Sequence, residues 1–189
     1  MSGMTEVSSL TGRLLVATPA LSDPNFDRAV VLLLDHDEEG SLGVVLNRPT
    51  PVGVEDILEG WGDLAGAPGV VFQGGPVSLD SALGVAVIPG EDGPLGWRRV
   101  HGAIGLVDLE APPELLASAL GSLRIFAGYA GWGPGQLEDE LAEGAWYVVE
   151  SEPGDVSSPV PERLWRAVLR RQRSELAMVA TYPDDASLN

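Results

Sequence analysis

The stretch that decides the fold of this chain runs from residue 128 to residue 141 and reads Gly128-Tyr129-Ala130-Gly131-Trp132-Gly133-Pro134-Gly135-Gln136-Leu137-Glu138-Asp139-Glu140-Leu141. The apolar residues that lead into it predict a strand over 123–129. Leu137 and Leu141 are four positions apart, which predicts a helix over 136–142 with both leucines facing the core. The stretch is therefore a passage from a strand into a helix.

The four glycines of this passage let its backbone approach another group closely, and phosphate binding is one use of such a loop. The sequence has neither Gly-x-Gly-x-x-Gly nor Gly-Lys-Ser/Thr, however. Glu138, Asp139 and Glu140 also occupy the first helical turns, where carboxylates complement the positive end of the helix and repel phosphate. We therefore expect the glycines to serve close packing.

Working outward, apolar runs and turn residues predict alternating strands and helices along the whole chain. The run over 26–34 is apolar at odd and even positions alike, which is typical of a strand covered on both faces. Further strands are expected over 13–18, 42–46, 70–73, 83–88, 100–109 and 145–150, and further helices over 54–61, 113–120, 161–173 and 175–180. Hairpins mixed with crossovers indicate an α+β fold with a mixed sheet.

Three more segments accompany the 128–141 stretch: Gly12-Arg13-Leu14-Leu15-Val16-Ala17-Thr18-Pro19, Asn47-Arg48-Pro49 and Gly74-Gly75-Pro76. With them the chain resembles the YqgE/AlgH family of bacterial proteins over residues 12–182, a family without an established biochemical function. The resemblance implies a mixed, curved sheet that forms a pseudo-barrel flanked by helices. The AlgH branch is associated with alginate regulation, which implies an indirect transcriptional regulator as one possible function.

The length of 189 residues and the 44% hydrophobic content predict one domain, which we place at 11–183 between a flexible N-terminus, 1–10, and a flexible tail, 184–189. The sequence contains no apolar run long enough for a membrane span and no signal-peptide pattern. We therefore expect a soluble, cytoplasmic protein without a membrane partner, and we favour a monomer.

Several chemistries are excluded by composition. The chain has no cysteine, and all 11 of its basic residues are arginines, so thiol, Schiff-base and P-loop lysine chemistry are impossible. His36 and His101 are the only imidazoles, too few for a multi-histidine metal site. No Gly-x-Ser-x-Gly elbow marks a serine nucleophile, although triads are recognised by geometry and not by motif. We expect no metal and no cofactor, and between an enzyme and a non-catalytic protein we favour the non-catalytic protein.

An acidic turn over 35–40 imitates the start of a calcium-binding loop. It fails at the twelfth position, where Leu46 stands in place of a bidentate glutamate, and its flanks predict strands instead of helices. We interpret it as a soluble hairpin tip, with His36 as an exposed turn residue.

Polar or glycine-rich residues stand where three predicted strands end, and ligand sites often form at such edges. We predict that these three turns converge on one groove with Arg48 as its only fixed positive charge. The candidate ligand-binding residues are Asn47, Arg48, Gln73, Gly74, Gly75, Trp132, Gln136 and Glu140. The alternative is structural: Trp132 fills the core, while Gln136 and Glu140 bond backbone groups or Arg48.

Arg163, Arg166, Arg170 and Arg173 recur at helical spacing opposite an apolar face. That face comprises Leu164, Trp165, Val168 and Leu169. This basic stripe is either a solvated surface that pairs with the protein's own carboxylates, which we favour, or a docking face for an acidic partner or a phosphate-bearing ligand.

Two classes of function remain open. The favoured one is a non-catalytic binding or regulatory protein that acts on a protein or small-molecule partner. The alternative is a metal-assisted hydrolase that uses carboxylates, with Asp23, Asp35, Asp37 and Glu140 as candidates. A net charge of −17 repels phosphate backbones, so we expect no direct binding of nucleic acid.

Overall fold

The computed structural model describes residues 9–21, 23–173 and 175–182. The predicted flexible termini lie mostly outside this range. The strands are β1 (Leu14–Ala17), β2 (Val30–Asp37), β3 (Gly40–Val45), β4 (Pro49–Gly53), β5 (Val70–Gln73), β6 (Val77–Val87), β7 (Trp97–His101), β8 (Ile104–Val107), β9 (Ser122–Trp132) and β10 (Trp146–Val149). The helices are α1 (Val54–Ile57), α2 (Glu114–Ala117), α3 (Gln136–Ala142), α4 (Pro153–Val156), the 3₁₀ turn η1 (Pro161–Arg163), α5 (Leu164–Arg170) and α6 (Leu176–Val179).

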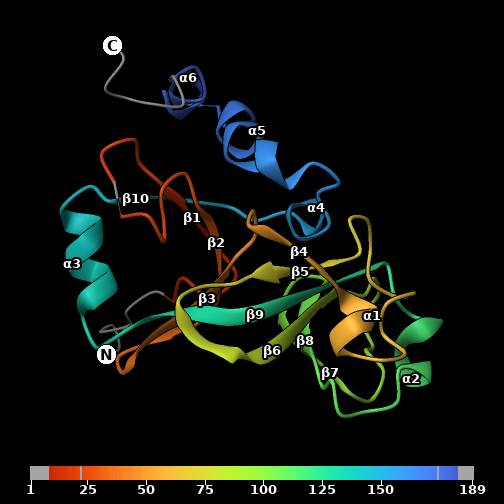
Figure 1. Ribbon diagram of the computed structural model, residues 1–189. Coiled ribbons are helices and arrows are strands. Elements are labelled where there is room, and N and C mark those ends of the chain that lie inside the picture. Colours follow the sequence, from red (N-terminus) through yellow and green to blue (C-terminus); the bar gives the residue numbers. More distant parts are fainter. Residues whose placement is uncertain (1–8, 22, 174, 183–189) are drawn as a thin grey trace.

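The strands form one strongly curled sheet in the order β10-β1-β2-β3-β9-β6-β8-β7 (Figure 1). Neighbours along this path are antiparallel, while β5 joins β9 in parallel and carries β4 on its other side. The 11-residue strand β9 pairs with β3 near its end and with β5 and β6 earlier, so it joins the two halves of the sheet. The predicted α+β fold with a mixed, curved sheet is confirmed.

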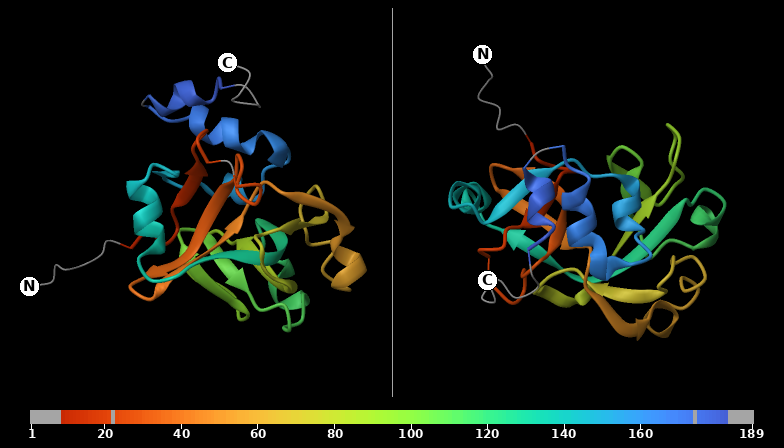
Figure 2. Two further views of the ribbon diagram at one scale, coloured as in Figure 1. Left: turned by 60° about the vertical axis from the view of Figure 1, so that its left-hand side comes forward. Right: turned by 90° about the horizontal axis from the view of Figure 1, so that it is seen from above.

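Helices cover the curled sheet on separate sides (Figure 2). Alternate residues of β1 and β2 enter different cores, because successive side chains of a strand point to opposite faces. Leu14 and Leu32 pack in the core that includes Trp165 of α5, whereas Leu15 and Leu33 pack in the core that includes Leu137 of α3. The predicted burial of both faces of β2 is therefore confirmed. A third core lies beneath α1 and α2, around Trp61 and Leu116.

Close backbone packing explains the glycines at the centre of the sheet. A Cβ atom on Gly75 would lie 2.2 Å from the carbonyl carbon of Tyr129, and one on Gly74 would lie 2.4 Å from the carbonyl oxygen of Gly128. Gly128 itself has a φ of +75°, which glycine adopts without strain. Glycines from two of the motif segments thus face each other where β9 passes the end of β5.

Some sequence predictions were wrong in detail. The strand expected over 100–109 is the hairpin of β7 and β8, which turns at Gly102 with a φ of +58°. The strand expected from Phe26 begins only at Val30, and the turn at Pro49 starts β4. Ile57, expected to face inward, is 50% exposed, and α1 ends at this residue, so the helix expected over 54–61 is only one turn long.

Candidate functional site

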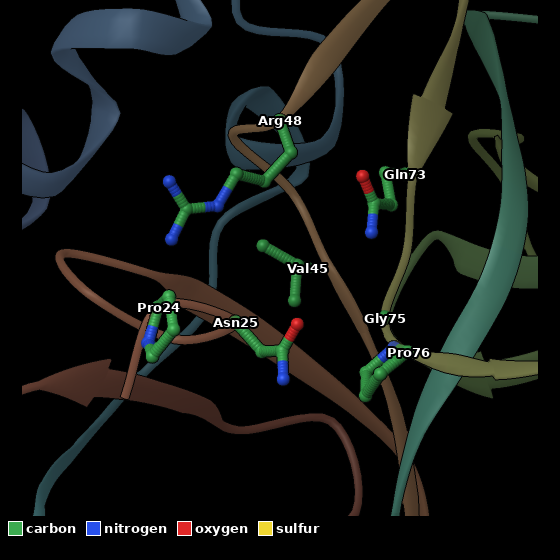
Figure 3. A pocket seen from close by; sticks show the side chains of 7 residues that line it. All are labelled: Pro24, Asn25, Val45, Arg48, Gln73, Gly75 and Pro76. Atoms are coloured by element: carbon green, nitrogen blue, oxygen red, sulfur yellow. The ribbon is translucent and has the colours of Figure 1, made fainter. Parts of the chain in front are cut away.

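Two of the three predicted turns meet at a small pocket (Figure 3). It lies where β3 ends, β4 begins and β5 ends, beside the loop that precedes β2. The cavity has a volume of about 150 Å³ and is lined by Pro24, Asn25, Val45, Arg48, Gln73, Gly75 and Pro76. Pro24 and Asn25 were not among the predicted site residues, because nothing in the sequence places their loop next to β5.

Asn47 positions the residue that follows it and does not itself face the pocket. Its Oδ1 accepts a hydrogen bond from the amide of Val30 at 3.0 Å, and its Nδ2 donates to the carbonyl of Arg28 at 2.9 Å. Both ends of the side-chain amide are thus used to hold the loop before β2 against the end of β3. Asn47 is a structural clamp that fixes where Arg48 leaves the sheet.

Arg48 is the only charged side chain among the residues that line this pocket. Its terminal NH2 donates a hydrogen bond to the carbonyl of Asp27, which holds the side chain along the pocket wall. That bond leaves other N–H groups of the guanidinium available, since arginine carries five donors. Arg48 is partly exposed, so an anion could reach it from solvent.

Gln73 stands across the pocket from Arg48 in Figure 3. The backbone N–H of Gln73 donates a hydrogen bond to the backbone carbonyl of Arg48 at 2.8 Å, which fixes the backbones of the two turns to each other. Gly74 continues the link, because its carbonyl accepts from the amide of Val45 at 2.8 Å. The walls of the pocket are therefore held by backbone hydrogen bonds, while the exposed Gln73 side chain is left to face a ligand.

The third predicted turn is not part of this pocket. Trp132 and Trp146 are buried, and each donates its indole N–H to Oε1 of Glu140 at 2.9 Å. Gln136 donates to Oε2 of the same carboxylate at 3.1 Å and accepts from the amide of Gly133 at 3.0 Å. These bonds match the structural alternative, except that Glu140 bonds two indoles and not Arg48. We predicted that three turns share one groove, and the pocket contains two of them.

His36 is buried, 4% exposed, so the prediction of an exposed turn residue was wrong. It lies inside β2, opposite Ser41 of β3, and its Nδ1 is 2.7 Å from the Ser41 hydroxyl. Its Nε2 lies 3.4 Å from a carboxylate oxygen of Glu138 on α3. Alternation along a strand could have suggested this burial, because His36 follows Leu34 at the same parity.

The order Ser41, His36, Glu138 resembles a catalytic triad, but its surroundings do not suit one. Ser41 lies in a strand that is paired on both sides, opposite His36 and Trp132, so the ladder occupies the backbone amides that an oxyanion hole needs. The neighbouring depression of about 330 Å³ is also lined by three carboxylates, which would repel an oxyanion; they belong to Asp35, Asp37 and Glu39. The three groups instead tie α3 to the hairpin of β2 and β3.

No cluster of three or more His, Asp or Glu side chains that could hold a metal ion occurs among residues 9–21, 23–173 and 175–182. The carboxylates that we considered for a hydrolase also lie in different places. Asp35 and Asp37 line the acidic depression, whereas Glu140 accepts hydrogen bonds from the two indoles.

Within the same described ranges, no helix is long and apolar enough to cross a membrane.

The predicted basic stripe on α5 is interrupted. Its apolar face is buried as expected, while Arg163, Arg170 and Arg173 are exposed. Arg166 differs, because it donates to the carbonyl of Ala180 and lies over the Trp165 ring. Arg171 lies outside the stripe and forms a bidentate ion pair with Asp155, at 2.5 and 2.8 Å. Asp155 and Glu152 accordingly raise the pKa of the Arg171 guanidinium above its usual value.

The chain is an α+β domain with a strongly curled sheet, and a small polar pocket lies at the ends of its strands. The family model described as "DUF179: AlgH-like" matches residues 14–177, so this chain belongs to the AlgH-like family. The predicted family is confirmed.

Relatives support this assignment over the full length. A UPF0301 protein of Streptomyces avermitilis is 91% identical, with 100% of both chains covered, and one of Thermobifida fusca is 50% identical, with 96% of each covered. A crystal structure from Corynebacterium diphtheriae has a TM-score of 0.87 at 32% identity and covers 91% of this chain and 92% of that one. The solution structure of AlgH from Pseudomonas aeruginosa has a TM-score of 0.66 at 28% identity and covers 96% of this chain and 98% of that one.

Proposed function

We propose that this chain is a non-catalytic, cytoplasmic binding protein whose pocket at Arg48 receives a single carboxylate group of a small molecule or partner. The observation that carries the proposal is the lining of the pocket: one guanidinium beside the amide side chains of Gln73 and Asn25. Guanidinium and amide groups recognise carboxylates by hydrogen bonding. None of the lining residues is a nucleophile or a general base, so the pocket can hold a ligand without reacting with it.

The size of the pocket limits the ligand. Drug-sized ligands and cofactors occupy roughly 300–1,000 Å³. A cavity of about 150 Å³ takes one small group, with the rest of the ligand outside. A net charge of −17 also disfavours ligands that carry several negative charges. A single carboxylate on an otherwise neutral ligand fits both limits.

This proposal can be tested by comparing the binding of acetate with that of acetamide, a neutral molecule of the same shape, at one ionic strength. Acetate should shift the backbone amide resonances around Arg48, Gln73 and Gly75, and acetamide should not, because only the carboxylate pairs with the guanidinium. Arg48→Gln should weaken acetate binding by about tenfold to a hundredfold, since a charge-assisted hydrogen bond contributes ~1.5–3 kcal/mol.

Arg163→Gln is the matched control, because Arg163 is an exposed arginine on η1, away from the pocket lining. It should bind acetate as the unmodified protein does. Equal shifts from acetate and acetamide, or acetate shifts that survive Arg48→Gln, would disprove the proposal.

The hydrolase alternative makes an opposite prediction for divalent cations. An ion that binds the folded chain more tightly than the unfolded chain raises the melting temperature by mass action. The described residues hold no cluster of three metal ligands. We therefore expect Mg²⁺ and Mn²⁺ to change the melting temperature by no more than about 1 °C, compared with a Na⁺ buffer of equal ionic strength that contains no divalent cation. A saturable rise that Asp35→Asn abolishes would favour the hydrolase.

A further inference from the structure

Arg124 is a buried arginine in the sheet, and the function proposed above does not involve it. Arg124 lies on β9 opposite Val85 of β6, and its side chain is 2% exposed. Its guanidinium carbon lies 4.3 Å from the centre of the Phe72 ring, on the side of the sheet that carries the largest core. Arg124 is therefore a charge held within an apolar core.

The hydrogen bonds of Arg124 use only part of its guanidinium. NH2 donates to the carbonyls of Ala67 and Ser158, at 3.1 and 3.0 Å. Nε and NH1 are fully buried and have no acceptor among the residues that the structure describes, and the same holds for Oγ of Ser122, two residues earlier on the same face of β9. Three N–H bonds and one hydroxyl are thus left without partners in one region of the core.

Two carbonyls and the Phe72 ring stabilise the charge of Arg124 only in part, because each of them carries only a partial negative charge. Across the described residues, no carboxylate forms an ion pair with it, whereas Arg13 and Arg171 both have acidic partners. Burial lowers the pKa of Arg124 to about 10, which still leaves it protonated at neutral pH. A buried cation normally requires an anionic partner, because desolvation is otherwise unopposed.

We propose that Arg124 and Ser122 bind a small inorganic anion, a halide such as chloride, inside the sheet. The anion accepts hydrogen bonds from Nε and NH1 of Arg124 and from the hydroxyl of Ser122. It supplies the negative charge that the described part of the chain does not place there.

The surroundings favour a monoatomic anion over a carboxylate-bearing ligand. Nε and NH1 have no space for a water molecule beside them, so the covering segments must move even for a halide and must move further for a larger ligand. Those segments are the loops that carry Ala67 and Ser158, which lie between regular elements. A halide needs the least displacement, and local opening of the two loops gives it a route inward.

The test measures melting temperature as chloride replaces gluconate at one fixed ionic strength, so that general screening of the −17 charge stays constant. Chloride should raise the melting temperature of the unmodified protein in a saturable way. Arg124→Met should abolish this rise. Ser122→Ala should shift its chloride midpoint upward by about tenfold, the cost of one charge-assisted hydrogen bond.

Arg163→Met is the control and should keep the full chloride response, since Arg163 is exposed. A crystal soaked in bromide gives a second readout that does not depend on a variant that folds poorly: an anomalous peak within hydrogen-bond distance of Nε or NH1 of Arg124 is expected. A chloride response that survives Arg124→Met, no response in the unmodified protein, or ordered water in place of bromide would each overturn the proposal.

Discussion

Trp165→Ala should lower the free energy of unfolding by about 4 kcal/mol, the range found when a large aromatic side chain is removed from a core. Trp165 is 3% exposed, and its indole N–H donates to the carbonyl of Ala17 at 2.8 Å. Its ring also lies beneath the guanidinium of Arg28 at 4.2 Å. The variant loses the contact that fastens α5 to β1, and urea denaturation followed by circular dichroism measures the loss.

Trp165→Phe separates packing from hydrogen bonding. It keeps most of the buried ring and removes the donor, so we expect a loss of about 1–2 kcal/mol. Arg163→Ala, an exposed change two residues away, should stay within ~0.5 kcal/mol. A loss below about 1.5 kcal/mol for Trp165→Ala would mean that the C-terminal helices contribute little to the core.

Glu140→Ala should cost about 3 kcal/mol, because it removes the acceptor of two buried indole N–H groups at once. Trp132 and Trp146 pack edge to face at 6.2 Å and are 6% and 5% exposed, so water does not readily replace the carboxylate. Chemical denaturation followed by tryptophan fluorescence reports both the stability and the environment of the two rings.

Two further variants serve as controls: Glu140→Gln keeps an acceptor at the same position, and Glu143→Ala removes a nearby exposed carboxylate. The amide of Gln retains one oxygen acceptor, so we expect a loss of about 1 kcal/mol. Glu143 is exposed at the end of α3, and its replacement should have almost no effect. If Glu140→Ala cost no more than Glu143→Ala, the carboxylate would not be structural, and Glu140 would again be a candidate for ligand binding.

The sequence predicts those features of the fold that local pattern determines. β1, β5, β10 and α3 were predicted to within one or two residues, because an apolar run or an i, i+4 spacing bounded each of them. The hairpin of β7 and β8 was missed because β7 carries the polar residues Arg98, Arg99 and His101, so the apolar residues after Gly102 determined the predicted strand. The length of β9 was missed because it continues as a strand through Gly128 and Gly131, which normally end one.

The candidate site was harder to predict, because its geometry depends on contacts between distant segments. That Arg48 and Gln73 lie together was expected from the ends of their strands, and their backbones are joined by a hydrogen bond. That Asn25 lies beside them could not be expected, since Asn47 draws that loop in through Val30 and Arg28. Nothing local marked Arg124 as buried, because arginine is usually exposed and its strand reads as apolar in any case.

The pairing of β1 with β10 has a consequence for synthesis of the chain on the ribosome. Leu14 pairs with Val149. The ribosome therefore adds 135 further residues after Leu14 before the strand that pairs with this edge of β1 has been made. At about 5–20 residues per second, that wait lasts roughly 7–27 s. Throughout this interval the nascent chain presents an unpaired strand edge of four consecutive apolar residues, Leu14 to Ala17. Until β10 has been made, this edge is therefore open to pairing with a strand of another chain.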